Sequence, residues 1–305
     1  MTGAEVEVLT TVAALRARAE AARHAGQTVG LVPTMGYFHA GHRSLMRAAR
    51  ADNDVVITTL FVNPTQFGAG EDLSKYPRDF EGDLAAAAAE GIDVLFAPSV
   101  DEMYPEPGRT TVHVSGLTAG LCGVARPTHF DGVTTVVTKL FSIVGPCRAY
   151  FGRKDAQQLA VIARMARDLD LPVEVIGCPL VREADGLAMS SRNAYLTPAE
   201  RTAALVLSRA LCRAGDVVVA GERDAAIVRA LIVAAIADEP TVTLDYAELV
   251  DARDLEPVAR LEGDVLVAVA ASVGRARLID NITIRIAEAG VDLDLGTTAS
   301  AREDV

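Results

Sequence analysis

The sequence has no tryptophan, and aromatic residues make up only 5% of its 305 residues. Cysteine is also scarce. Its four cysteines are widely separated and form neither a CxxC pair nor a spacing typical of metal ligands. This arrangement argues against a disulfide framework and predicts reduced thiols in a cytoplasmic protein. We expect most of these side chains to pack as small apolar groups; they are Cys122, Cys147, Cys178 and Cys212.

Long apolar segments are missing as well. No apolar run approaches the roughly 20 residues that a membrane-spanning helix needs. The N-terminal stretch MTGAEVEVLTTV lacks the basic and apolar regions of a signal peptide. We therefore expect a cytoplasmic protein without a membrane partner.

Positive charge is in short supply, because 29 Lys and Arg residues face 41 Asp and Glu residues, for a net charge of −12. Proteins that bind nucleic acids need a basic face, so this balance argues against a nucleic-acid partner. The acidic excess is then a contribution to solubility. At 305 residues, half of them apolar, the chain can form one large or two medium domains with a proper core.

Up to about residue 179 the sequence alternates short apolar segments with amphipathic ones. The apolar segments have the length of buried strands, and the amphipathic ones have helical spacing. This alternation predicts an α/β fold with a parallel sheet covered by helices and with ligands at the carboxyl ends of the strands. The expected strands are 28–32, 55–62, 92–97, 149–151 and 173–176, and the expected helices are 11–23, 39–50, 80–90, 131–144 and 155–169.

Beyond residue 179 the pattern changes to a hairpin or loop, then two amphipathic helices, then three strands. The helices are expected at 198–214 and 224–237, and the strands at 243–250, 265–271 and 276–280. We predict a first domain over 1–179 and a second, smaller α+β domain over 180–288 that closes over the site. The remaining residues, 289–305, carry Gly, Thr, Ser and charge and are expected to form a flexible tail.

The stretch LVPTMGYFHAGHRSLMRAAR, residues 31–50, is the strongest candidate for a ligand site. It turns after a short apolar strand, and His39 and His42 then open a helix. Residues three apart lie on the same side of a helix, and Gly41 leaves room for a nucleotide against the backbone. The free N–H groups of a helix start favour phosphate, so this pattern indicates a nucleotide site. The alternative is a pair of structural imidazoles near a helix start.

Three further segments have polar side chains suited to substrates. In FVNPTQF, Gln66 offers both a donor and an acceptor, but a simple turn hydrogen bond is an equal alternative. In FGRKDAQQ, Lys154 can meet phosphates as a mobile point charge, whereas Asp155 can cap the following helix. In MSSRN, two hydroxyls and a guanidinium suit phosphate oxygens, and an ordinary surface loop is the alternative.

The ordered set PTMG with HAGH, FVNPTQF, YPRDF, RPTHFDGV, FGRKDAQQ and MSSRN resembles the pantoate–β-alanine ligase (pantothenate synthetase) family. HAGH by itself resembles the HxGH signature of the wider nucleotidylyltransferase superfamily. The resemblance implies a Rossmann-like domain followed by a smaller C-terminal domain. It also implies an ATP-dependent ligase of pantothenate and coenzyme A biosynthesis, which joins (R)-pantoate to β-alanine through pantoyl adenylate and releases AMP and pyrophosphate.

The resemblance also implies roles for individual residues. Catalytic roles fall to His42, which is usually the acid, and to His39, Lys154 and Arg192. Pantoate and β-alanine would contact Gln66, Asn63, Gln158, Arg126 and His129. ATP would contact Pro33, Thr34, Met35, Gly36, Tyr37, Phe38, His39, Ala40, Gly41, His42, Gly152, Arg153, Lys154, Asp155, Val181, Met189, Ser190, Ser191 and Arg192.

Metal and partner expectations come from the same resemblance. Transfer from ATP calls for Mg²⁺, and Asp83 matches the metal-associated aspartate of the family. The alternative for Asp83 is a solvated helix acid. The family is typically dimeric, which implies a homodimer. One departure is Cys122, where the family pattern LEGxxRP has a glutamate, and the sequence shows no dedicated base for the amine step.

Three rival functions fit parts of the pattern. Another nucleotidylyltransferase would share HAGH and MSSR, but FVNPTQF and GRKDAQQ argue against it. A class I aminoacyl-tRNA synthetase would need a basic tRNA-binding domain. A nucleotide-binding regulator without catalysis is supported only by the departure at Cys122.

Overall fold

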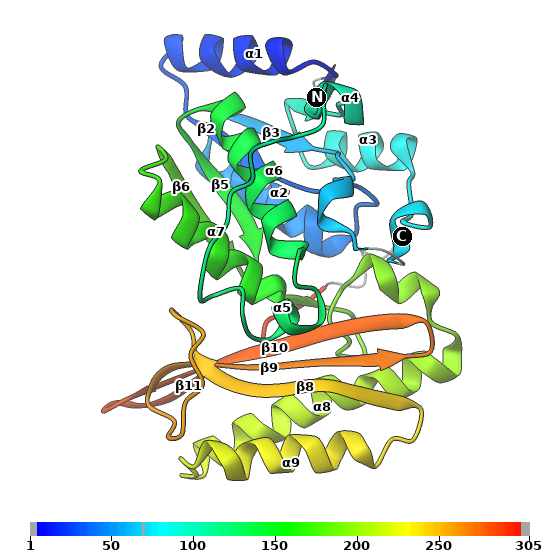
Figure 1. Cartoon of the computed structure of the whole chain (residues 1–305), viewed down its shortest axis with the longest axis vertical. Coiled ribbons are helices and arrows are strands. Elements are labelled where there is room, and N and C mark those ends of the chain that lie inside the picture. The colour runs from blue at the N-terminus through cyan, green and yellow to red at the C-terminus, as the bar shows by residue number, and fades with distance from the viewer. Residues whose placement is uncertain (1–4, 69–70, 300–305) are drawn as a thin grey trace. The chain divides into compact units, whose positions relative to one another are not determined.

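The computed structural model describes residues 5–68 and 71–299. The chain divides into two compact units, drawn together in Figure 1. The first comprises Met1–Ala119, Gly123–Arg153 and Val161–Cys178, and the second comprises Gly120–Cys122, Lys154–Ala160 and Pro179–Val305. The division does not fall at a single point in the chain, because two short segments before Pro179 belong to the second unit.

The first unit is built on a six-stranded sheet with the order β1-β4-β3-β2-β5-β6. All neighbouring strands are parallel, which confirms the predicted α/β class. The central strands β2 and β3 are buried along their whole length, so they are apolar at nearly every position. The strands are β1 (Glu7–Leu9), β2 (Val29–Val32), β3 (Val55–Thr59), β4 (Val94–Phe96), β5 (Cys147–Gly152) and β6 (Val173–Cys178).

Helices lie between these strands in the sequence. Residues of α2 and α3 pack with the strands into one apolar cluster. The α-helices are α1 (Val12–His24), α2 (Ala40–Asp52), α3 (Phe80–Ala89), α4 (Val100–Met103), α5 (Cys122–Ala125), α6 (His129–Val144) and α7 (Ala156–Asp168). Three short 3-10 helices are η1 (Pro64–Gln66), η2 (Asp72–Ser74) and η3 (Arg153–Asp155).

The predicted strand 55–62 is too long, since β3 ends at Thr59. Residues 60–63 leave the sheet and lead into η1, where the Asn63 side chain accepts a hydrogen bond from the Thr65 N–H. Pro64 has no N–H to donate to a ladder, which explains why the apolar run does not continue as a strand. The polar end of this segment is therefore displayed just beyond the carboxyl edge of the sheet.

The second unit is an antiparallel sheet with the order β11-β10-β9-β8, against which α8 and α9 pack (Figure 1). Helix α8 starts with a capping box in which Thr197 and Glu200 satisfy each other's backbone N–H groups. The elements are β7 (Val181–Arg182), η4 (Ser191–Tyr195), α8 (Pro198–Val219), α9 (Ala225–Ala237), β8 (Val242–Asp251), β9 (Gly263–Val273), β10 (Ala276–Ala287), β11 (Gly290–Asp294) and β12 (Thr297–Thr298).

The flexible tail predicted over 289–305 is wrong for residues 290–299. Strand β11 pairs with β10, and β12 pairs in parallel with β7. The sequence pattern missed these strands because they are short, polar and half-exposed edge segments. The last six positions of that predicted tail, 300–305, lie outside the described residues.

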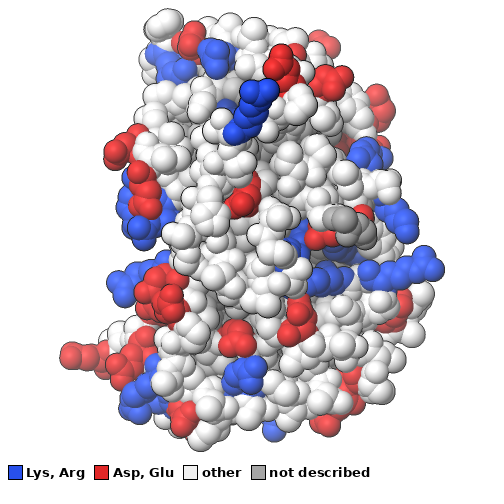
Figure 2. Space-filling model, in the orientation of Figure 1, with Lys and Arg blue, Asp and Glu red and all other residues white. Residues whose placement is uncertain are grey.

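Asp and Glu side chains are spread over the face seen in Figure 2, with Lys and Arg side chains among them. Among the described helices, none combines the length and the apolar character needed to cross a membrane.

Candidate functional site

The turn between β2 and α2 holds two consecutive residues in the left-handed region, with φ of +89° at Gly36 and +56° at Tyr37. This conformation directs two successive backbone N–H groups to one acceptor. The Tyr37 N–H donates to Asp83 Oδ2 at 2.8 Å, and the Phe38 N–H donates to Asp83 Oδ1 at 2.6 Å. A buried carboxylate from α3 therefore fixes the loop that leads into His39.

His39 and His42 stand together at the start of α2, as the spacing predicts. Their ring centroids are 4.0 Å apart, with an interplanar angle of 31°. His39 has extended backbone and caps the helix, and its N–H donates to His42 Nδ1 at 3.4 Å. A ring nitrogen that accepts is unprotonated, so in the neutral ring the proton lies on Nε2, which can donate to a bound oxygen. The helix dipole adds a positive potential at the same end of α2.

Asn63 and Gln66 form a buried amide pair beyond β3, with only 1% and 9% of their surface exposed. Asn63 Nδ2 donates to Gln66 Oε1 at 3.1 Å and to the Gly132 carbonyl at 3.1 Å. Gln66 Nε2 reaches the sulfur of Met35 at 3.3 Å. The Gln66 side chain therefore lies next to the loop that precedes His39, and it also makes a hydrogen bond within its own turn, with Asn63.

Helix α6 comes close to this pair. A Cβ at Gly132 would lie 2.6 Å from Gln66 Cα, so glycine allows the two backbones to meet. Two more predicted residues contact the backbone carbonyl of Gln66. The His129 ring contacts this oxygen through Nδ1 at 2.9 Å, and Arg126 Nη2 donates to it at 3.3 Å. The structure thus brings Asn63, Gln66, Arg126 and His129 together.

Arg126 already has a carboxylate partner. Its Nε donates to Glu71 Oε1 at 2.8 Å, and its Nη2 donates to Glu71 Oε2 at 2.6 Å. The hydrogen bond from Arg126 lowers the pKa of Glu71 below its ordinary value. Sequence reasoning missed Glu71, since an isolated acid in a loop gives no signal of its partner.

In the second unit, Lys154 and Asp155 lie in η3, immediately before α7. Lys154 is mostly buried, and its ammonium is 3.8 Å from Asp155 Oδ2. Of the two adjacent glutamines, Gln157 is buried, whereas Gln158 is half-buried. Gln157 Oε1 accepts from the Cys122 N–H at 2.9 Å, and its Nε2 donates to Gly120 O at 2.8 Å. Sequence analysis missed this structural role because neighbouring helix positions cannot be ranked without their packing partners.

The segment with MSSRN begins as a hairpin and ends in η4. The Met189 N–H donates to Val181 O at 2.9 Å, which closes the hairpin. Ser190 then caps η4, accepting from the Arg192 N–H at 3.3 Å. Asn193 Nδ2 donates to Glu183 Oε1 at 2.6 Å and to Ala188 O at 3.0 Å. Hydrogen bonds at both ends therefore fix the conformation of the predicted phosphate-binding loop.

Asp83 fits neither of its two predicted roles well. It is only 2% exposed, which excludes a solvated helix acid. Both of its oxygens accept backbone N–H groups, and no cluster of three or more His, Cys, Asp or Glu side chains that could hold a metal occurs within residues 5–68 and 71–299. Burial raises the pKa of this carboxyl, although the two backbone hydrogen bonds oppose the rise. The donor set does not fit a Mg²⁺ site, and it favours a structural role for Asp83.

Comparison with known proteins gives consistent matches over most of the chain. The model of the pantoate–β-alanine ligase family matches residues 7–283. Pantothenate synthetase of Moorella thermoacetica is 56% identical over 281 residues, which cover 92% of this chain and 99% of that protein. Pantothenate synthetase of Heliobacterium modesticaldum is 59% identical over 261 residues, which cover 86% of this chain and 93% of that protein.

Solved structures agree with these matches. The crystal structure of pantothenate synthetase from Thermus thermophilus superposes with a TM-score of 0.86 at 48% identity, covering 90% of this chain and 98% of that one. Pantoate–β-alanine ligase from Francisella tularensis, in complex with βγ-ATP and β-alanine, gives a TM-score of 0.74 at 31% identity, covering 90% of this chain and 97% of that one.

Proposed function

This chain belongs to the pantoate–β-alanine ligase family and condenses pantoate with β-alanine using ATP, and we propose that it does so through an enzyme-bound pantoyl adenylate. The observation that carries the adenylate step is the imidazole pair at the start of α2. His39 and His42 stack 4.0 Å apart at a helix N-terminus, where anionic oxygens are favoured.

In the proposed first step, a pantoate carboxylate oxygen attacks the α-phosphorus of ATP. The bond from that phosphorus to the bridging oxygen breaks, and pyrophosphate leaves with the negative charge. His42 Nε2–H and His39 donate to phosphate oxygens as this charge develops. Preorganised donors of this kind contribute most where they meet transition-state charge.

Pantoate has a carboxylate and hydroxyl groups, and amide side chains can bind both. We assign Gln66 and Asn63 to this task, since their buried side chains are already ordered by each other and by Gly132 O. His129 and Arg126 contact the backbone carbonyl of Gln66, so their contribution is to fix the position of that residue. Gln158 remains a proposed pantoate contact.

The remaining ATP contacts are proposed from the resemblance. Within the first unit they include the loop of residues 33–38, Gly152 and Arg153. Within the second unit, Lys154, Asp155, Val181 and the Met189–Arg192 turn would bind the nucleotide, with Lys154, Ser190, Ser191 and Arg192 at its phosphates. A lysine and an arginine suit this role because both carry permanent positive charge near pH 7.

In the proposed second step, the neutral amine of β-alanine attacks the acyl carbon of the adenylate. The bond from this carbon to the AMP oxygen breaks, AMP leaves, and the nitrogen loses a proton as the amide forms. Bulk water can take this proton, so no side chain is assigned as the base.

Mg²⁺, assembly and location are further proposals. Mg²⁺ would enter with ATP and be held mainly by phosphate oxygens, as this ion prefers oxygen ligands and keeps several waters. A homodimer in the cytoplasm is proposed from the family resemblance, and the four free cysteines agree with a reducing compartment.

The test is pyrophosphate release from ATP and Mg²⁺ with (R)-pantoate, measured with and without β-alanine. Sustained release that requires both substrates, together with equimolar AMP and pantothenate, is the expected result. With pantoate alone, a single burst equal to the enzyme concentration is expected from the adenylate. AMP formation without any burst, even in rapid-quench experiments, would contradict the adenylate intermediate.

A further inference from the structure

A buried ion pair lies within the second unit. The exposed fraction of the side chain is 8% for Arg182 and 3% for Asp280. Arg182 Nη1 donates to Asp280 Oδ2 at 2.8 Å, and Nη2 donates to Asp280 Oδ1 at 3.0 Å, so the pair is bidentate. Such a pair needs its remaining donors satisfied, because each charge has been removed from water.

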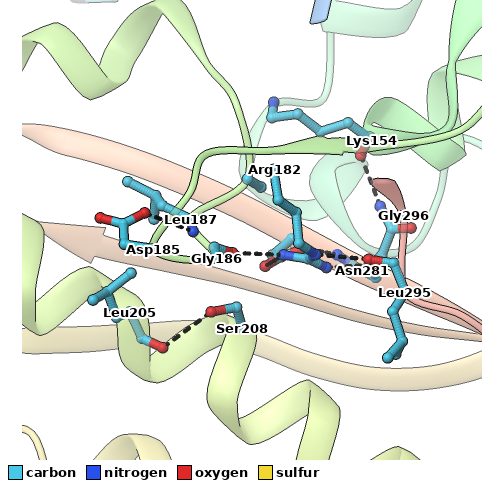
Figure 3. Close-up of polar contacts among 12 residues, drawn as sticks. Lys154, Arg182, Asp185, Gly186, Leu187, Leu205, Ser208, Asn281, Leu295 and Gly296 are labelled. Carbon is cyan, nitrogen blue, oxygen red and sulfur yellow. Dashed lines mark hydrogen bonds and ion pairs between the residues drawn. The ribbon is translucent and has the colours of Figure 1, made fainter. Parts of the chain in front are cut away.

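The other donors of Arg182 are all used by backbone carbonyls. Nε donates to Leu295 O at 2.7 Å, Nη1 to Gly186 O at 3.1 Å, and Nη2 to Asn281 O at 3.4 Å. Figure 3 shows the guanidinium between Gly186 and the Leu295–Gly296 segment. One side chain therefore ties together the hairpin that precedes Ser190, strand β10 and the segment before β12.

Asn281 connects the Arg182–Asp280 pair to the backbone of Lys154 through hydrogen bonds. Its Nδ2 donates to the Lys154 carbonyl at 2.8 Å, as drawn in Figure 3, and its own N–H donates to Asp280 Oδ1 at 2.7 Å. The residue is only 7% exposed. Its amide thus joins η3 to the same buried cluster that holds the 181–189 hairpin.

We propose that Asn281, anchored by the Arg182–Asp280 pair, is a positioning residue that holds Lys154 in its phosphate-binding position. This inference rests on the proposed function of Lys154 as an ATP contact. Lysine is a flexible point charge, and its entropy cost on binding falls when the backbone that carries it is fixed. The hydrogen bond from Asn281 holds the backbone carbonyl of Lys154 within η3.

The pair itself is a poor target for a test. Removing one partner leaves an uncompensated buried charge, and the second unit could unfold for that reason alone. Asn281→Ala removes the bond to Lys154 and keeps both charges. Asn281→Leu is nearly the same size and has no hydrogen-bonding group, so it tests the same bond without leaving a cavity or adding a charge.

The first unit offers a matched control. Asn53 is also 7% exposed, and its Nδ2 donates to the Ala49 carbonyl at 2.8 Å and to the Tyr150 hydroxyl at 2.8 Å. Asn53→Ala should therefore lower thermal stability at least as much as Asn281→Ala, but the Asn53 amide donates to no predicted ATP contact. A change in ATP affinity that follows Asn281 and not Asn53 cannot result from general destabilisation.

The experiment is a double-mutant cycle with Lys154→Ala on the full chain, read as the dissociation constant for ATP with Mg²⁺ by calorimetry. We expect Asn281→Ala to weaken ATP binding about tenfold, a typical effect for the loss of one hydrogen bond to a binding group. If Asn281 acts through Lys154, the double variant Asn281→Ala/Lys154→Ala should bind ATP as weakly as Lys154→Ala alone, and no more weakly.

Two results would overturn the proposal: unchanged ATP affinity in folded Asn281→Ala and Asn281→Leu, or losses that simply add to that of Lys154→Ala. The readout does not require turnover. It therefore separates failure of this inference from failure of the ligase assignment, which is decided by pyrophosphate release in the unaltered enzyme.

Discussion

Gly36 and Asp83 are packed so closely that a Cβ added at Gly36 would lie 2.9 Å from Asp83 Oδ2. With φ of +89°, Gly36 also has a backbone conformation that other residues rarely adopt. The glycine therefore allows the loop to fold over the carboxylate, and the carboxylate holds the two N–H groups that follow. The approach to His39 depends on both residues together.

Asp83→Asn should weaken this loop. In the wild type both carboxylate oxygens accept from a backbone N–H. In asparagine one of these oxygens becomes an NH₂ group, which cannot accept, so one buried backbone N–H loses its partner. The expected loss of unfolding free energy is about 1–3 kcal/mol. We also expect KM for ATP to rise by about tenfold, because a misplaced positioning group costs at least this much. Glu81→Gln is the control, since Glu81 is exposed on the same helix. Equal effects of the two variants would exclude the positioning role.

His42→Asn should keep the fold and lose the first chemical step. The imidazole is only partly buried, and an asparagine can still accept the weak bond from the His39 N–H. The expected loss in kcat is about 10²–10³-fold, typical for removal of one donor to transition-state charge. Single-turnover pyrophosphate release with pantoate measures this directly. A wild-type burst rate in His42→Asn would remove His42 from catalysis.

The Glu71–Arg126 pair predicts a pH effect below neutrality. The pKa of Glu71 in the folded chain lies below its ordinary value of 4.5, chiefly because Arg126 donates to it. Its ionised form therefore stabilises the fold above pH 4.5, and this contribution is lost as the pH falls through the lowered pKa.

Glu71→Gln should consequently reduce stability at pH 7 by less than about 1 kcal/mol, as expected for a partly exposed pair. The difference from the wild type should shrink as the pH is lowered through that range. Chemical denaturation at a series of pH values measures both. A difference that stays constant down to full protonation would show that the pair does not contribute in this way.

The exposed thiol of Cys212 should react before those of Cys147 and Cys178. Burial raises the pKa of Cys147 to about 12 and that of Cys178 to about 11. At pH 8 their thiolate fractions are then on the order of 10⁻³ or less, and the thiolate is the reactive form. Cys212 is exposed, so a maleimide should label it first. Mass spectrometry of partially labelled protein gives the order, and early labelling of Cys147 in the folded protein would contradict the raised pKa of its thiol.

The parallel sheet of the first unit could be predicted from the sequence, since β2 and β3 are buried on both faces and must be apolar throughout. The pairing of His39 with His42 was equally accessible, because residues three apart share a helix face. By contrast, the C-terminal end predicted for β3 was wrong, and so was the flexible tail predicted for residues 290–299. Whether such a short segment forms a strand depends on the residues that pack or pair with it in the folded chain, and the local composition does not identify those residues.

What the sequence determined by itself is the set of chemical groups and their local geometry: two imidazoles at a helix start, amides after a strand, and a lysine before a helix. The tertiary structure alone decided how these groups are held. Asp83 is 45 residues from Phe38 in the chain, and Asn281 is 127 residues from Lys154. Hydrogen bonds over such separations form only when the chain has folded, because no periodicity in the sequence links the partners. For that reason the pattern of the candidate groups could be predicted from the sequence, and the partners that hold them could not.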